Sequence, residues 1–359
     1  MKRIKKLLNR IFIDGLSGMA LGLFATLIIG TILQQVAALF SDYINYDIGR
    51  YIFFVSKAAM AATGAGIGVG IAHKFGESPL VTISAAVNGI VGAFASKIIA
   101  GAFISESGAV MFAGPGEPLG AFIAAYIGIE VGHLISGKTK LDILLTPIVS
   151  IAAGSAVGLL AGPPISQLMA RLGEVIGWAT VQHPFVMGIV VSVVMGMALT
   201  LPISSAALGV ILNLSGIAAG AAVVGCCANM VGFAVASYRE NKLGGALAQG
   251  IGTSMLQIPN IVKNPVIWLP AIAASAVLGP VSTMLVQLEC NATGAGMGSA
   301  GLVGQIMTYQ CMAPKHGAAV TVFVILIMQF VLPGLIAFGV SELLRKKNLI
   351  KFGDMKLEM

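Results

Sequence analysis

Residues 318–341 read AAVTVFVILIMQFVLPGLIAFGVS and contain no charged side chain. A helix of about 20 apolar residues crosses the roughly 30 Å hydrocarbon layer of a membrane. Similar runs recur along the chain, of which 57% is hydrophobic and only 10% charged, with a mean hydropathy of +0.95. A soluble domain of 359 residues cannot bury so much apolar surface. The chain is therefore predicted to fold within lipid.

Continuous apolar runs favour helices over a transmembrane barrel, whose strands alternate in hydropathy over about ten residues. We predict an all-α integral membrane protein with about ten transmembrane helices. The expected spans cover residues 13–38, 51–72, 79–104, 119–136, 141–161, 184–212, 216–238, 243–259, 264–286 and 318–341. The 46 glycines suit this class, because small residues let membrane helices pack closely and permit broken helices.

The net charge of +7 is concentrated at the two ends of the chain. Basic residues precede the first span and follow the last: Lys2, Arg3, Lys5, Lys6 and Arg10, then Arg345, Lys346, Lys347 and Lys351. The positive-inside rule places both ends in the cytoplasm and requires an even number of crossings. This distribution indicates a multi-pass plasma-membrane protein, with the lipid bilayer as partner and no nucleic acid. The first apolar run continues past residue 30, so we expect a retained span rather than a cleaved signal peptide.

A proline-initiated segment of mixed polarity divides the chain in half. It opens with Pro163 and Pro164 and combines Arg171 and Glu174 with apolar side chains, which is typical of an amphipathic helix at the membrane surface. We predict three parts: a first transmembrane repeat over 1–162, an interfacial connector over 163–183, and a second repeat with a short cytoplasmic tail over 184–359.

The two halves resemble each other weakly. At a shift of 186 positions, ATGAGIG at 62–68 matches AQGIGTS at 248–254, and Pro79 matches Pro265. At a shift of 178 positions, GMAL at 18–21 matches GMAL at 196–199. Internal duplication is common in secondary transporters, whose solute site forms between the repeats. We expect two five-helix repeats. Five spans per half would make them inverted, although Lys74 and Lys263 cannot then both be cytoplasmic.

The same shift of 186 lays one glycine-rich segment over another. Four glycines and two prolines interrupt ESGAVMFAGPGEPLG at 106–120, and five glycines interrupt NATGAGMGSAGLVGQ at 291–305. Neither suits a spanning helix, so both are predicted to be re-entrant or unwound. Irregular backbone at membrane depth must be satisfied by protein or a water-filled cavity, which suits a hydroxyl-rich or anionic ligand. The alternative is that both segments are extramembrane turns.

These two segments supply the predicted solute-binding residues. They are Glu106, Ser107, Gly108, Met111, Gly114, Gly116, Glu117, Asn291, Thr293, Gly294, Gly296, Met297, Ser299 and Gln305. The two carboxylates are candidates because a charge inside a membrane is costly and usually functional, whereas in a loop it would simply be solvated. The second segment supplies neutral polar groups, so the predicted cavity is asymmetric in charge.

Catalytic, metal and cofactor sites are not predicted. The sequence lacks Gly-x-Ser-x-Gly and His-Glu-x-x-His. Glu130 and His133 stand at i and i+3 on one helix face, and a structural or proton-linked pair is favoured over a metal site because no second Glu-x-x-His exists. Cys226, Cys227, Cys290 and Cys311 lack metal spacing and are predicted to pack in the core. The amides Asn88, Asn213, Asn229, Gln249 and Gln257 suit interhelical hydrogen bonds as well as ligand contacts.

At SGAVMFAGPGEPLG (107–120) and its second-half partner, the chain resembles the enzyme II C components of the sugar phosphotransferase system. The branch it is similar to includes the perfringolysin-O regulator-like membrane proteins. The resemblance extends over nearly the whole chain and rests on loose Gly and Ala patterns. It implies a channel or elevator-like carrier for a sugar or related solute. In phosphotransferase carriers, partner subunits relay a phosphate from His or Cys to the incoming sugar, and this relay is not visible here. The resemblance therefore implies separate A and B subunits, transport without phosphorylation, or a sensor.

Taken together, these features favour a transporter of a small polar solute, such as a sugar or sugar derivative, that works by alternating access between two repeats. A membrane-embedded solute sensor or regulator is the alternative, and a structural or channel-forming protein is less favoured. The chain is not expected to be an enzyme by itself, except as the membrane subunit of a phosphotransferase system. A homodimer is compatible with this interpretation. The substrate, the mode of energy coupling and the oligomeric state are not fixed by the sequence.

Overall fold

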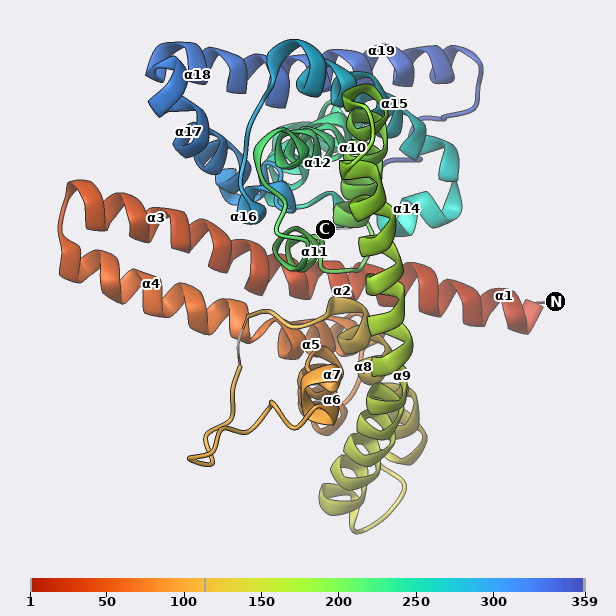
Figure 1. Ribbon diagram of the computed structural model, residues 1–359. Coiled ribbons are helices and arrows are strands. Elements are labelled where there is room, and N and C mark those ends of the chain that lie inside the picture. Colours follow the sequence, from red (N-terminus) through yellow and green to blue (C-terminus); the bar gives the residue numbers. More distant parts are fainter. Residues whose placement is uncertain (1, 113, 358–359) are drawn as a thin grey trace. The chain divides into compact units, whose positions relative to one another are not determined.

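The computed structural model describes residues 2–112 and 114–357, and within these ranges the chain is helical, with two isolated β-bridges and no strand (Figure 1). It forms two compact units, Met1–Leu168 and Met169–Met359. Long apolar helices make up much of each unit. The fold class is therefore that of a helical membrane protein, as predicted.

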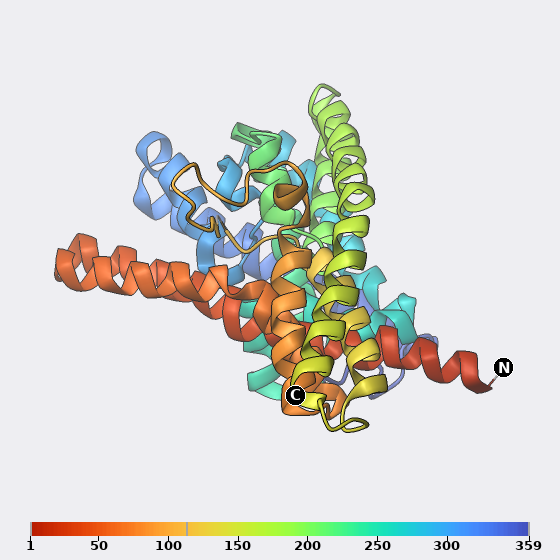
Figure 2. The same ribbon diagram turned by 90° about the horizontal axis from the view of Figure 1, so that it is seen from below.

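The first unit consists of helices that follow one another through short turns and one longer loop. They are α1 (Lys2–Asn9), η1 (Arg10–Gly15), α2 (Leu16–Leu23), η2 (Phe24–Ile28), α3 (Ile29–Tyr43), α4 (Tyr46–Ala61), α5 (Thr63–Phe75), α6 (Pro79–Ala93), α7 (Ala95–Ile99), α8 (Pro118–Ile135) and α9 (Asp142–Thr180), which ends in the second unit. α3 and α4 lie side by side as a helical hairpin (Figure 2). α4 and α5 are bent by 54° at Ala62.

Glycine pairs bring the helices of the first unit into backbone contact. A Cβ on Gly22 of α2 would fall on the Gly66 carbonyl of α5, and a Cβ on Gly92 of α6 would fall on the Gly120 carbonyl of α8. A Cβ on Gly64 would lie 2.6 Å from the Gly89 carbonyl oxygen. Close approach of small residues is how membrane helices gain packing energy without a hydrophobic driving force. The tight packing predicted from the glycine content is present.

Gly22→Ala is expected to lower the free energy of unfolding by about 1–3 kcal/mol, because the added methyl group forces α2 away from α5. The matched control is Gly177→Ala in α9, where a Cβ meets no atom within 4 Å. There the better helix propensity of Ala should stabilise the protein by up to about 0.5–1 kcal/mol. Thermal unfolding of both purified variants checks the prediction, and equal shifts in Tm would contradict it.

The second unit is built around one buried helix. Its elements are α10 (Pro184–Thr200), α11 (Ser205–Ile211), α12 (Gly216–Ala236), α13 (Tyr238–Leu247), η3 (Ala248–Gly252), η4 (Ser254–Gln257), α14 (Ile258–Lys263), η5 (Pro265–Trp268), α15 (Leu269–Pro280), η6 (Val281–Val286), α16 (Ala292–Ala295), η7 (Ala300–Leu302), α17 (Val303–His316), α18 (Ala318–Leu326), η8 (Ile327–Val331) and α19 (Leu332–Lys346). α10, α15 and α19 all pack on α12, and 94% of the apolar 18-residue stretch of α12 is buried.

Six helices of the described residues are long and apolar enough to cross a membrane, or seven if the bent pair α4 and α5 counts as one span. They are Lys6–Ser41, Pro118–Ile135, Asp142–Thr180, Gly216–Ala236, Pro265–Val286 and Ala318–Lys346. Of the other predicted spans, 79–104 and 184–212 contain the shorter apolar helices α6 and α10. The span expected at 243–259 is broken, because η3 and η4 interrupt it at Thr253. The predicted total of ten is therefore not established.

The predicted repeat finds mixed counterparts in the structure. Pro79 and Pro265 both begin helices, after Ser78 and Asn264, whose side chains cap the new helix. Gly64 lies in the regular helix α5, whereas its match Gly250 lies in the π-helical turn η3. The division of the chain into two five-helix repeats remains a prediction.

The predicted connector at 163–183 is helical through residue 180. Pro163 and Pro164 lie inside α9 rather than at its start, and Arg171 pairs with Glu174 one turn later at 3.0 Å on an exposed face. The boundary between the two compact units falls within this segment, after Leu168. Its position at the membrane surface stays a prediction.

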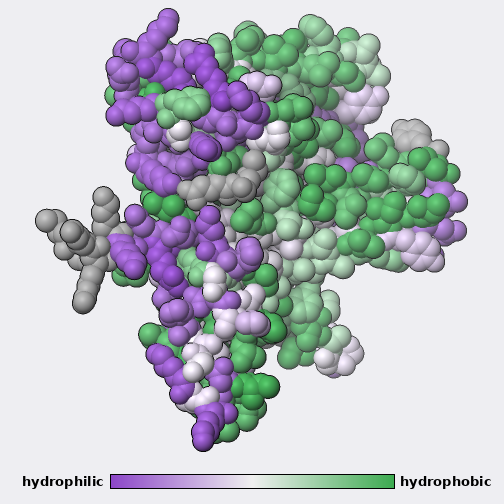
Figure 3. All heavy atoms as spheres, turned by 180° about the vertical axis from the view of Figure 1, so that it is seen from behind, coloured by the Kyte–Doolittle hydropathy of each residue, from purple (hydrophilic) through white to green (hydrophobic). Residues whose placement is uncertain are grey.

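Large apolar side chains remain exposed on many helices. They include Phe54 of α4, Leu160 of α9, Val277 of α15 and Phe323 of α18. Figure 3 shows that hydrophobic residues cover broad areas of the visible surface. Exposed apolar surface on such long helices is what contact with lipid requires.

Candidate functional site

The first glycine-rich segment forms an exposed hairpin between α7 and α8. Ile104 and Val110 form an antiparallel bridge, and Gly108, with φ +81°, closes the turn by donating its N–H to the Ser105 carbonyl. The predicted site residues of this hairpin are exposed; they are Glu106, Ser107, Gly108 and Met111. Phe103 and Phe112 pack on Phe94, which lies between α6 and α7, and anchor the hairpin.

The end of this segment is fixed against α6. The Glu117 N–H donates to the Ala93 carbonyl at 2.8 Å, and Pro118 begins α8 directly afterwards. A Cβ on Gly116 would lie 2.6 Å from the Ala93 side chain, and its φ of +75° also requires glycine, whereas Gly114 lies in open space. Glu117 is thus placed by backbone contacts at the start of α8, half-buried beside the end of α6.

The second glycine-rich segment is irregular and largely buried. Asn291 caps α16 by accepting the Gly294 N–H at 3.0 Å, and Gly296 packs against Ser205 of α11. Gly298, Gly301 and Leu302 have φ between +54° and +61°, so the chain turns through left-handed backbone before α17. Such conformations in a non-glycine residue cost energy and are concentrated at functional sites. Of the remaining predicted residues, Ser299, Gln305 and Gly294 are buried, Met297 is half-buried and Thr293 is exposed.

A second chain break lies against this segment. The helix formed by α13 and η3 ends at Thr253, which is extended at φ −158° and ψ 140°, and the chain resumes as η4 and α14. Ser299 donates its hydroxyl to the Gly250 carbonyl of η3 at 2.5 Å and also contacts Met230 of α12. Gln305 donates to Cys227 of α12 at 3.4 Å. We call Gly250, Ser299, Gln305 and the facing residues Cys227 and Met230 the break site.

Gln305 carries a buried acceptor that the described protein groups do not satisfy. Its side chain is 8% exposed, and its Oε1 has no hydrogen-bond partner among the described residues. A buried polar atom without a partner costs about 1–3 kcal/mol and is uncommon in native proteins. A carbonyl oxygen of this kind accepts a hydrogen bond from a hydroxyl group. The break site therefore offers a buried acceptor suited to a hydroxyl-bearing ligand.

A chain of amide side chains begins beside the break site. Gln249 of η3 donates to the Ser237 hydroxyl at 2.9 Å and accepts from Gln257 Nε2 at 2.8 Å. Asn260 donates to Gln257 Oε1 at 2.8 Å. We call Ser237, Gln249, Gln257 and Asn260 the amide chain. All four are buried, and a connected network in a low-dielectric interior fixes the position of each member.

Asn229 of α12 holds the other side of the helix break. Its Oδ1 accepts from Trp268 Nε1 at 2.9 Å and from Thr200 at 3.2 Å, while its Nδ2 donates to Ser275 at 3.2 Å. Thr200 also lies 2.8 Å from the hydroxyl of Ser254 in η4. These contacts tie α10, α15 and η4 to α12. Asn229 is satisfied on both sides, so its role is to position the break.

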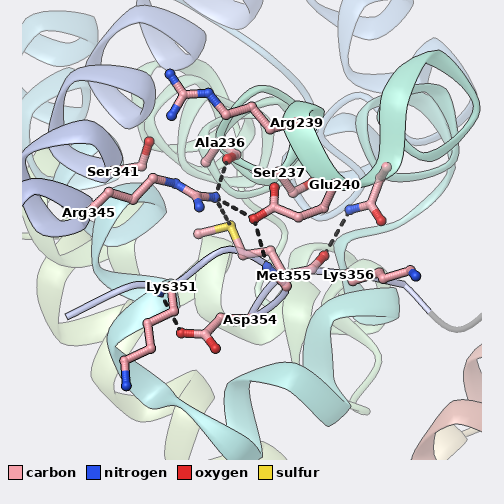
Figure 4. Close-up of polar contacts among 12 residues, drawn as sticks. Ala236, Ser237, Arg239, Glu240, Ser341, Arg345, Lys351, Asp354, Met355 and Lys356 are labelled. Atoms are coloured by element: carbon pink, nitrogen blue, oxygen red, sulfur yellow. Dashed lines mark hydrogen bonds and ion pairs between the residues drawn. The ribbon is translucent and has the colours of Figure 1, made fainter. Parts of the chain in front are cut away.

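A buried ion pair lies next to the amide chain (Figure 4). Arg345 Nη2 of α19 is 2.8 Å from Glu240 Oε1 of α13, and the two side chains are 10% and 0% exposed. The same nitrogen donates to the Ala236 carbonyl at 3.1 Å. Asn241 and Asn264 also contact this region, through the main chain of residues 349–357. The sequence did not identify Glu240, Asn241 or Asn264 as members of a polar site. The five amide side chains between positions 241 and 264 of an otherwise apolar chain could have indicated such a site.

In the first unit, Glu130 and His133 belong to a network of four side chains. Arg10 lies between two carboxylates, with Nε 2.6 Å from Glu130 Oε1 and Nη2 3.1 Å from Glu77 Oε1. His133 Nδ1 lies 2.9 Å from the other oxygen of Glu77, whose side chain is 4% exposed. The two residues predicted as a pair are thus linked through Arg10 and Glu77, which the sequence did not single out.

The cysteines are mostly buried. Cys226, Cys227 and Cys290 are enclosed, and Cys311 is half-buried. Burial raises the pKa of the Cys290 thiol to about 11, so this group stays protonated and unreactive near neutral pH. Among the described residues, no group of three or more His, Cys, Asp or Glu side chains is arranged to hold a metal ion.

Comparison with known proteins identifies one family. The chain matches the family described as “Phosphotransferase system, EIIC” over residues 13–357, which is almost its whole length. No curated protein matches the chain. The family match agrees with the resemblance inferred from the sequence.

Proposed function

Because this chain belongs to the phosphotransferase system EIIC family, it is a membrane component of sugar transport, and we propose that it binds its sugar at the break site and the adjoining amide chain. The observation that carries this proposal is the buried, unpartnered Gln305 Oε1 at the meeting of two chain breaks. Discontinuous helices that expose backbone and polar side chains form the solute sites of many transporters. The family match supports the transporter and gives the sensor alternative no support.

The chemistry of the proposed site fits a neutral, hydroxyl-rich solute. Gln305 offers an acceptor, and Gln249 and Gln257 offer amide groups that both donate and accept. A sugar hydroxyl can likewise donate and accept. No charged side chain belongs to the break site or the amide chain as defined, so a formal charge on the solute is not required.

Partners and mechanism follow as further parts of the proposal. Proteins of this family act with phosphotransferase A and B components, and we propose the same partners here. Alternating access is supported by the division of the chain into two compact units, which we propose correspond to the halves that move. Contact of the first glycine-rich segment, including Glu106 and Glu117, with the same solute remains a prediction, as do a homodimer and cytoplasmic ends.

The test is binding of D-glucose, D-mannitol and D-gluconate, which represent a hexose, a hexitol and a sugar acid. Binding to the folded state raises its stability by about 2.7 kcal/mol at a concentration of 100 times the Kd, so a ligand is recognised by a rise in Tm. Gln305→Met should weaken the binding of that sugar about three- to tenfold, because one buried hydrogen bond is lost.

Gln329→Met is the matched control for Gln305→Met. Gln329 of η8 is also buried, and its Oε1 also lacks a partner among the described residues, but its amide contacts Thr308 rather than the break site. We expect this variant to retain the parental affinity. Equal loss of affinity in the two variants, or no response to any of the sugars, would contradict the proposed site.

A further inference from the structure

The chain folds back on itself after α19. Asn348 and Gly353 have φ of +57° and +97°, and these two left-handed residues turn residues 348–357, the C-terminal segment, onto α13 and α14. Asp354 stabilises the second turn by accepting the Lys351 N–H at 2.8 Å. Ile350 and Met355 are buried in a cluster with Phe233 and Ile267, while Phe352 between them is 77% exposed.

The amide chain binds the main chain of this segment. Met355 presents its carbonyl to Gln257 Nε2 at 2.9 Å and to Asn241 Nδ2 at 2.8 Å, and Lys356 presents its carbonyl to Asn260 Nδ2 at 2.9 Å. Asn241 Oδ1 also accepts the Leu357 N–H at 2.8 Å. In each of these bonds a side-chain amide about a hundred positions earlier in the sequence contacts a backbone group of the segment, as donor to the two carbonyls and as acceptor from the Leu357 N–H. Contacts to main-chain groups bind a peptide segment independently of its side chains.

The segment also covers the buried ion pair (Figure 4). Glu240 Oε1 lies within 3.4 Å of the Gly353 N–H, and the Met355 sulfur is 4.0 Å from Arg345 Nη2. Glu240 Oε2 has no partner among the described residues, although the side chain is fully buried. The docked segment therefore encloses polar groups that are not all satisfied by the protein.

Gln257 connects the segment to the proposed sugar site. Its Nε2 donates both to the Met355 carbonyl and to Gln249 Oε1, and Gln249 precedes Gly250 of the break site. An amide nitrogen has only two hydrogens, so the contact with Met355 uses the donor that would otherwise be available to a solute hydroxyl. The same holds for Asn260, which donates to Gln257 and to Lys356.

We propose that the C-terminal segment is an internal ligand of the amide chain and that it competes with the sugar for Gln257 and Asn260. With the segment docked, the amide donors are occupied by peptide carbonyls. With the segment released, the same donors face a hydroxyl-rich solute. The sugar-binding role of the amide chain is taken from the proposed function, and competition with the segment is the added inference.

The first experiment measures release of the segment. Leu357→Cys, at a buried position of the segment outside the cluster of Ile350 and Met355, is made in a Cys311→Ser background, because Cys311 is the half-buried native thiol. Its maleimide labelling should be slow without sugar and at least fivefold faster at a saturating concentration of whichever of D-glucose, D-mannitol and D-gluconate raises Tm. Phe352→Cys, on the exposed side of the same segment, should label rapidly and equally in both conditions.

The second experiment measures affinity in variants with a weakened segment. Met355→Ala removes the buried anchor, and Asp354→Ala removes the turn contacts to Lys351 and Asn264 without changing the buried core. We expect about tenfold tighter sugar binding for the first and about threefold for the second. Asp354→Ala carries the test if Met355→Ala does not yield monodisperse protein.

The outcomes separate this inference from the proposed function. A sugar that raises Tm while the Leu357→Cys labelling rate and the affinities of both variants stay unchanged would overturn the competition and leave the sugar site standing. Sugar binding detected in the weakened variants but not in the parent would support the competition. No response to any of the three sugars in the parent or in either variant would overturn both.

Discussion

Arg345→Met is expected to lower the free energy of unfolding by about 3–5 kcal/mol, because it leaves a fully buried carboxylate without its cation. Glu240 lies 2.8 Å from Arg345, and the two side chains are only 0% and 10% exposed to solvent. The double variant Arg345→Met, Glu240→Gln should recover most of this loss, since it removes both charges together. Thermal and denaturant unfolding of the purified protein measure both effects.

Arg239→Met is the control for this prediction. Arg239 forms an ion pair with Glu342 at 3.0 Å in the same region, but the two side chains are 55% and 26% exposed. Exposed pairs contribute only about 0–1 kcal/mol because water already solvates both charges. A loss for Arg345→Met as small as that for Arg239→Met would show that the buried pair is not required for stability.

Arg10→Met should destabilise the first unit by about 3 kcal/mol, the lower end of the range for a broken buried pair. The substitution leaves the buried Glu77 with His133 at 2.9 Å but without its arginine, and it also removes the arginine from Glu130. The estimate is at the lower end because Arg10 and Glu130 are each about one-third exposed. The Tm of the purified variant reports the loss.

The matched control is Arg171→Met, which breaks a pair with Glu174 that is exposed on both sides. We expect less than about 1 kcal/mol there. Glu77→Gln is a second comparison, because the amide keeps the shape of the side chain and an acceptor for Arg10. If Arg10→Met and Arg171→Met shift Tm equally, the four-residue network does not stabilise the first unit.

The sequence identified part of the proposed site and missed the rest for a clear reason. Gly298, Gly301 and Gln305 lie in a segment whose glycine content alone predicts irregular backbone, and that backbone is observed. The same irregular backbone was predicted for the first segment. The structure instead forms an exposed hairpin at Glu106 and Met111, because a bridge between Ile104 and Val110 satisfies the backbone locally. Glycine content predicts a break in a helix, and it does not predict what the break contacts.

Lipid as the solvent and helices as the fold were determined by the sequence itself, because the need to satisfy every backbone group over about 20 apolar residues is a local property that hydropathy reports. The family resemblance was also accessible, since it depends on residue patterns along the chain. Only the tertiary structure decided that Arg345 pairs with Glu240, that Arg10 joins Glu77 to Glu130, and that the Met355 carbonyl reaches Gln257. These partners lie 67 to 120 positions apart, and a buried polar group is satisfied by whichever neighbour the packing of helices brings to it, which no local pattern encodes.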